Sequence, residues 1–104
     1  MAFTLELSAK ARSDLDDIAE YSRIRFGLRQ ADVYIDTLET AFIMLLTHPF
    51  TGYDFSHIGE NYRCYNVEHH RLFYLVTENK VVILRVLHKS MLPTHHLTQR
   101  DNFE

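Results

Sequence analysis

Residues 62–91 read YRCYNVEHHRLFYLVTENKVVILRVLHKSM, and this stretch decides the fold. It holds three runs of strand length, residues 62–67, 70–76 and 81–88, which are rich in β-branched and aromatic side chains. Short polar pieces, residues 68–69 and 77–80, separate the runs. Because a crossover helix cannot fit into such short connections, neighbouring runs must pair antiparallel, as a meander.

The beginning of the chain predicts a strand followed by a helix. Residues 3–7 alternate apolar and polar side chains, which is typical of a half-buried strand. Ser8 stands where a helix N-cap belongs, and a helix is expected from about residue 9 to residue 26. Its predicted buried face has 3–4 residue spacing and consists of Ala11, Leu15, Ile18, Ala19, Ser22 and Phe26.

A second helix is expected from about residue 29 to residue 47. Gly27 is predicted to be a left-handed C-terminal cap of the first helix, and Pro49 ends the second. The tight turn folds the two helices into an antiparallel hairpin, whose apolar faces need a sheet to cover them. The expected face of the second helix comprises Ala31, Tyr34, Ile35, Leu38, Phe42 and Leu45, widened by Ile43, Met44 and Leu46.

These elements predict an α+β fold in which an N-terminal strand and a helical hairpin pack on a mainly antiparallel sheet. Residues 49–61 contain a proline and two glycines and are predicted to be an irregular loop. A short helical turn is expected near residues 93–97. We expect one domain over residues 1–97 and a mobile polar tail over residues 98–104.

Bulk properties exclude several classes of protein. The 104 residues are 46% hydrophobic and 24% charged, which is a globular composition. Residues 1–6 lack the features of a signal peptide, no apolar run could span a membrane, and Cys64 has no disulfide partner, so we expect a cytoplasmic protein. A net charge of -3 argues against a duplex-binding protein that works by general electrostatics, and we expect no direct, sequence-specific binding of nucleic acid by this chain alone.

Four pieces of the chain, covering roughly residues 4–97, resemble the RelE/ParE superfamily of bacterial toxins and specifically its ParE branch. The last strand is the most specific of the four, and the order of elements also matches. The pieces are Asp14-Leu15-Asp16-Asp17-Ile18-Ala19-Glu20-Tyr21 with Arg25-Phe26-Gly27, His48-Pro49-Phe50-Thr51-Gly52, Tyr62-Arg63 with His70-Arg71-Leu72-Phe73-Tyr74, and Arg85-Val86-Leu87-His88-Lys89-Ser90-Met91.

The resemblance implies the toxin of a type II toxin–antitoxin module, neutralised by a cognate ParD-like antitoxin. ParE-type members are associated with inhibition of DNA gyrase, which makes a non-enzymatic toxin the favoured interpretation. One alternative is a ribosome-dependent endoribonuclease of RelE type, which would use His70 or His88 with Arg63 and Arg85. Another is a non-toxic relative that only binds an antitoxin.

Six residues of the meander and its end are candidates for contact with the target or the antitoxin. They are Arg63, Arg71, Tyr74, Arg85, His88 and Lys89. For the arginines the alternative is an internal partner that locks the sheet, because a cation in an apolar strand is costly unless it is paired. For His70 and His88 the alternative is a structural role at a strand end.

Several other polar residues are given structural interpretations. Asp14, Asp16 and Asp17 are predicted to form a solvated helix face, and Cys64 is predicted to be a buried small residue. Strand geometry would turn His69 and His70 to opposite faces, so no metal or other cofactor is expected.

The sequence departs from the family pattern at Leu92. Relatives often have Asp before Pro-x-x-His-Leu, which corresponds here to Pro93-Thr94-His95-His96-Leu97. Leucine cannot cap a helix, so the final helical turn is expected to be weaker by about 1 kcal/mol.

Overall fold

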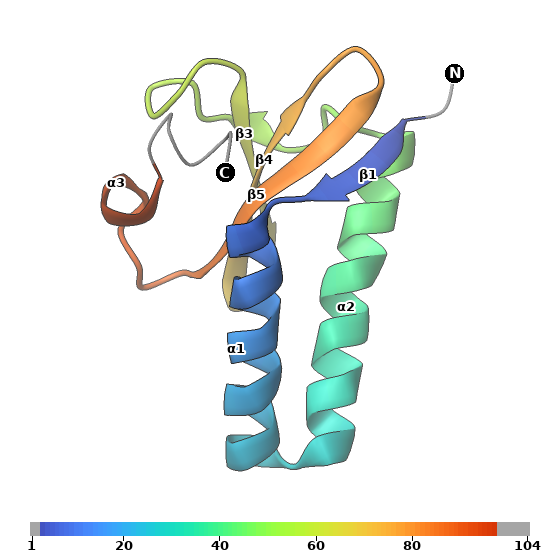
Figure 1. Cartoon of the computed structure of the whole chain (residues 1–104), viewed down its shortest axis with the longest axis vertical. Coiled ribbons are helices and arrows are strands. Elements are labelled where there is room, and N and C mark those ends of the chain that lie inside the picture. The colour runs from blue at the N-terminus through green and yellow to red at the C-terminus, as the bar shows by residue number, and fades with distance from the viewer. Residues whose placement is uncertain (1–2, 98–104) are drawn as a thin grey trace.

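A hairpin of two long helices, α1 (Ala9–Phe26) and α2 (Leu28–Thr47), packs against one five-stranded sheet (Figure 1). The computed structural model describes residues 3–97; the expected tail at residues 98–104 lies outside them. Within this range no helix combines the length and the apolar character needed to cross a membrane. The strands are β1 (Thr4–Leu7), β2 (Tyr53–Asp54), β3 (Tyr62–Val67), β4 (His70–Val76) and β5 (Lys80–His88), and a final turn forms α3 (Pro93–His96).

The meander and the α+β class are confirmed. The strand order is β1-β5-β4-β3-β2, and the pairs within β2–β5 are antiparallel. Only β1 runs parallel to its neighbour β5, so the sheet is mainly antiparallel. A register shift between Phe73 and Tyr74 interrupts the β4–β5 pairing and gives β5 one extra residue there.

The expected irregular loop at residues 49–61 contains a strand, which corrects the prediction. Tyr53 and Asp54 pair with Cys64 and Arg63 of β3 and extend the sheet by one short edge strand. Two residues between turns carry no readable periodicity, so only the pairing with β3 defines β2.

Both helices of the hairpin are confirmed, and the start of α1 is capped as expected. Ser8 Oγ accepts a hydrogen bond of 3.0 Å from the Ala11 amide. Gly27 has the expected positive φ of 96°, but its ψ of 164° lies outside the left-handed helical region, which corrects the predicted cap conformation. This combination is essentially restricted to glycine, and it turns the chain directly into α2.

Two residues assigned to the buried helix faces are exposed, which corrects the prediction. Phe26 and Ile43 are each 63% exposed. Phe26 lies at the turn of the hairpin, and Figure 1 shows this end extending past the sheet, so none of the described strands covers it. On α2 the small residue Ala41 is buried instead of Ile43.

The sheet carries a core on each face. Leu38, Phe42 and Leu45 of α2 pack with Tyr74 and Ile83 on the face that the hairpin covers. Cys64 is buried, as expected, in the core on the opposite face. The buried residues of this second core are Phe55, Tyr62, Cys64, Phe73, Val82, Leu84, Leu87 and Leu97. The loop before β3 and Leu97 after α3 close this second face, and Leu92 gives α3 no side-chain cap, as expected.

Candidate functional site

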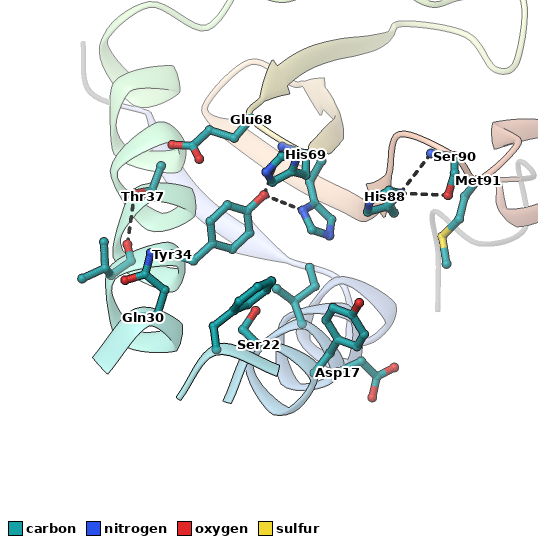
Figure 2. Close-up of a pocket in the computed structure, with 15 residues that line it drawn as sticks. Asp17, Ser22, Gln30, Tyr34, Thr37, Glu68, His69, His88, Ser90 and Met91 are labelled. Atoms are coloured by element: carbon teal, nitrogen blue, oxygen red, sulfur yellow. Dashed lines mark hydrogen bonds between the residues drawn. The ribbon is translucent and has the colours of Figure 1, made fainter. Parts of the chain in front are cut away.

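A groove of about 740 Å³ lies between the two helices and the end of the sheet (Figure 2). Its walls come from α1, from α2, from the turn between β3 and β4, and from the segment after β5. The groove exists because the hairpin extends past the sheet, so the facing sides of its two helices are not covered there.

The walls of the groove are largely apolar and exposed. Tyr21 is 61% exposed, Phe26 63% and Val33 53%, and Met91 approaches from the segment after β5. A contiguous apolar surface on a small protein usually marks a site for a partner. The sequence assigned Tyr21, Tyr34, Phe42 and Met44 mostly to the core and predicted an antitoxin contact for any of them exposed on the hairpin; Tyr21 is exposed, whereas Phe42 is buried.

A polar cluster closes the sheet end of the groove. Tyr34 Oη lies 2.6 Å from His70 Nδ1 and accepts a hydrogen bond of 3.2 Å from the His69 amide. The His70 and His88 rings are 5.4 Å apart and nearly perpendicular, and His88 Nδ1 accepts a hydrogen bond from the Ser90 amide. Figure 2 marks the bonds at Tyr34 and at His88 with dashed lines.

Burial and neighbouring charge shift two pKa values in this cluster. Desolvation, together with repulsion from His88 and His69, lowers the pKa of His70 from 6.5 to about 4. Desolvation raises the pKa of Tyr34. Both side chains are therefore neutral at neutral pH, and a hydrogen bond, not an ion pair, joins them.

The expectation that His69 and His70 face opposite sides is wrong. Both line the groove, and their rings lie 6.3 and 5.4 Å from the Tyr34 ring. The alternation of a strand does not apply, because His69 belongs to a tight turn in which Glu68 has a φ of 50°. No cluster suitable for a metal ion occurs within residues 3–97.

Arg85 is engaged by a carboxylate within the chain. Its Nε and Nη2 each donate to Asp14 at 2.9 Å, and its Nη1 donates to the His96 carbonyl at 2.8 Å. The two side chains are only 15% and 12% exposed. The prediction of a solvated Asp14 is therefore wrong, and for Arg85 the geometry favours the structural alternative.

The physical reason for this pair lies at the edge of the sheet. β1 ends at Leu7, opposite Ile83, so the rest of β5 has no neighbouring strand on that side within residues 3–97. Side chains of the N-cap and of α1 replace it: Ser8 Oγ donates to the Leu84 carbonyl, and Asp14 accepts from the Val86 amide. Asp14 thus accepts hydrogen bonds both from the backbone of β5 and from the Arg85 side chain.

Arg63 and Tyr74 both hold the connection after α2. Arg63 donates to the carbonyls of Phe50 and Gly52, and its guanidinium lies 5.3 Å from the centre of the Phe50 ring. Tyr74 is completely buried, donates to the Pro49 carbonyl and accepts from the Gly52 amide. Tyr74 therefore does not reach a partner, which corrects its place among the binding candidates.

The remaining candidates lie elsewhere on the surface. The Arg71 guanidinium lies 5.9 Å from the centre of the Phe73 ring, a residue of the core opposite the hairpin. Lys89 is exposed beside His88, and its amide donates to the His69 carbonyl. Of the six candidates, only His88 lines the groove.

Comparison with known proteins identifies the family. Residues 5–93 match the model of the ParE toxin of type II toxin–antitoxin systems. This chain belongs to the ParE toxin family. Toxin ParE1 of Caulobacter vibrioides is 40% identical over 91 residues, covering 88% of this chain and 94% of that protein. Toxin ParE1 of Mycobacterium tuberculosis is 34% identical over 86 residues, covering 82% of this chain and 88% of that protein.

Two solved structures share the fold of this ParE-family toxin. A chain of the chromosomal ParDE toxin–antitoxin system from P. aeruginosa superposes with a TM-score of 0.73 and 19% identity, covering 83% of this chain and 95% of that one. A chain of the toxin–antitoxin complex RelBE2 from Mycobacterium tuberculosis superposes with a TM-score of 0.63 and 24% identity, covering 86% of this chain and 100% of that one.

The four residues considered for a ribonuclease are not assembled in this ParE-family toxin. His70 and His88 are paired neighbours at one end of the meander. Arg63 pairs with Tyr74 towards the other end of β4, and Arg85 is bound to Asp14. No cation of this set stands beside the two histidines to stabilise a phosphate.

Proposed function

We propose that this protein acts in the cytoplasm as a toxin that inhibits DNA gyrase and is neutralised by a ParD-like antitoxin. The observation that carries the proposal is the 40% identity to Toxin ParE1, which extends over nearly the whole of both chains. The ParE branch, which this sequence resembles, is associated with inhibition of gyrase.

The groove is the surface we propose for the antitoxin. It is apolar, open and built on the hairpin, and its walls remain exposed in the isolated chain. The P. aeruginosa neighbour is described as part of a ParDE system and the RelBE2 neighbour as a toxin–antitoxin complex, so this fold accompanies antitoxins elsewhere. An amphipathic segment of an antitoxin would bury the exposed aromatic side chains.

We further propose that the toxin acts by binding and not by chemistry of its own. Lowering the pKa of His70 to about 4 leaves it uncharged at neutral pH, and a short hydrogen bond joins its Nδ1 to Tyr34. Arg85 is occupied by Asp14. A general acid or base for RNA cleavage would need a cation close to the scissile phosphate, and neither Arg63 nor Arg85, the cations considered for this role, stands beside the histidines.

The test is a gyrase assay with the purified toxin. We expect loss of supercoiling and accumulation of cleavage complexes, and we expect the antitoxin encoded by the adjacent reading frame to reverse both effects. A toxin that leaves gyrase unaffected at every stoichiometry contradicts the proposal. Cleavage of transcripts within codons in a translation extract, lost in His88→Ala, would establish the ribonuclease instead.

A further inference from the structure

One hydrogen-bond donor among the residues that line the groove is held in place by a neighbouring side chain. It is the Nε2–H of His70, whose ring is bonded to Tyr34. Tyr34 Oη already accepts a hydrogen bond from the His69 amide. The 2.6 Å separation between Tyr34 Oη and His70 Nδ1 is typical of a bond in which a hydroxyl donates. Because 2.6 Å is shorter than the usual range for an N–H donor, the geometry points to the Tyr34 hydroxyl as the donor and to Nδ1 as the acceptor.

This bond determines the tautomer of the imidazole. A neutral histidine has one acceptor nitrogen and one donor nitrogen, so an accepting Nδ1 places the ring proton on Nε2. Burial among the groove residues keeps the pKa of His70 low, and the ring is neutral at neutral pH. No hydrogen bond within residues 3–97 reaches Nε2, although the residue lines the groove.

A partner segment that packs against His70 in the groove would meet this donor. If the entering segment were apolar at this point, it would remove water from the N–H and leave the donor unpaired, which weakens binding. Asp17 and Glu68 line the same groove and would repel a carboxylate brought close to them. A neutral oxygen can accept the hydrogen bond from Nε2–H without being repelled by Asp17 and Glu68.

Resting on the proposed function, we propose that the antitoxin segment in the groove places a neutral oxygen, from a hydroxyl or amide side chain, against His70 Nε2. This contact distinguishes antitoxins that carry an acceptor at that position from those that are apolar there. Tyr34 is a positioning residue, because it contacts His70 and holds the proton on Nε2.

The experiment measures the affinity of the antitoxin encoded by the adjacent reading frame for variants of the full toxin, by titration calorimetry. His70→Phe keeps an aromatic ring but has no donor, and we expect about tenfold weaker binding. His70→Gln can place an amide N–H near the position of Nε2 and should recover most of the affinity. His95→Phe, an exposed histidine of α3 outside the groove, is the matched control and should bind like the wild type.

Two further measurements separate the inference from its alternatives. Nitrogen-15 NMR of the free toxin should show the proton of His70 on Nε2, and Tyr34→Phe should produce a mixture of tautomers and weaker binding. If His70→Phe does not fold, Tyr34→Phe carries the affinity test. The penalty of the variants should not change with salt, whereas a penalty that shrinks at high salt would indicate a carboxylate and overturn the neutral acceptor.

The outcomes for the inference and for the proposed function are distinct. Wild-type affinity in both His70→Phe and Tyr34→Phe, or a proton on Nδ1, would overturn the inference and leave the toxin–antitoxin pair intact. If the wild-type toxin does not bind the antitoxin at all, both the inference and the proposed antitoxin partner are overturned.

Discussion

The pair of Asp14 and Arg85 joins three elements through two side chains. Asp14 binds the guanidinium and the Val86 amide, and Arg85 also reaches the His96 carbonyl. A nearly buried ion pair adds little net stability compared with apolar residues, but removal of one partner leaves the other charge uncompensated. The two residues are therefore interdependent.

Asp14→Asn should lower the free energy of unfolding by about 3 kcal/mol, because Arg85 would lose its counter-charge in a partly buried site. Urea denaturation of the purified toxin measures this difference. Asp16→Asn is the control, since Asp16 is exposed on the same helix, and its effect should stay within about 0.5 kcal/mol. Equal effects of the two substitutions would show that the internal pair does not stabilise the fold.

His70 should make stability depend on pH in mildly acidic solution. Its pKa is about 4 in the folded chain and near 6.5 in an unfolded one, so the unfolded state binds more protons between these values. The free energy of unfolding should therefore fall by about 2 kcal/mol as the pH drops from 6.5 to 4. This is less than the full shift in pKa would give, because solvent partly screens the half-buried ring. Chemical denaturation at several pH values measures the loss.

The control compares two histidine substitutions. His70→Phe should remove this part of the pH dependence, because no imidazole remains to take up the proton on unfolding. His95→Phe should retain it. The same slope in all three proteins would mean that His70 titrates normally in the folded chain.

At the scale of elements, the turn between α1 and α2 depends on a single glycine. Gly27→Ala should destabilise the protein by about 1–3 kcal/mol, because φ of 96° with ψ of 164° is a conformation that other residues rarely adopt. An added Cβ would meet nothing within 4 Å, so the cost is one of backbone conformation alone. Leu28→Ala, at the next and exposed position, should change the melting temperature far less.

The short helix α3 can be strengthened at its first position. Leu92 provides no side-chain hydrogen bond to α3, and Leu92→Asp should supply one worth about 1 kcal/mol. The expected result is slower amide hydrogen exchange at His95, His96 and Leu97. Leu92→Ala cannot cap and should leave the exchange unchanged; equal protection in both variants would contradict the capping argument.

Element boundaries were largely predictable, whereas β2 was not. The 3.6-residue spacing of α1 and α2 and the apolar runs of β3–β5 are strong local signals. β2 has two residues and exists only through its pairing with β3. The buried faces were less certain, because Phe26 has helical spacing but lies past the end of the sheet.

At the scale of the whole molecule, the exposed hairpin end should matter for binding and not for folding. Phe26→Ser should change the free energy of unfolding by less than about 0.5 kcal/mol, because the side chain is already 63% exposed. It should weaken antitoxin binding about tenfold, since the ring lines the groove. Calorimetry and thermal unfolding of the same preparation separate the two effects.

Ile43→Ser is the matched control for this prediction. Ile43 is also 63% exposed on α2, but it does not line the groove. We expect wild-type affinity and wild-type stability from this variant. If it weakens binding as much as Phe26→Ser does, the antitoxin contacts the outer side of the hairpin and not the groove.

The sequence by itself determined the α+β class, both long helices, the meander and the family resemblance, because these depend on local periodicity and short motifs. Only the tertiary structure decided which polar residues are internal. Asp14 and Arg85 are 71 residues apart, and the charge pattern of α1 resembles any solvated face. The groove likewise depends on how far the hairpin extends past the sheet. Contacts between distant segments follow from packing in three dimensions, which a local pattern does not contain.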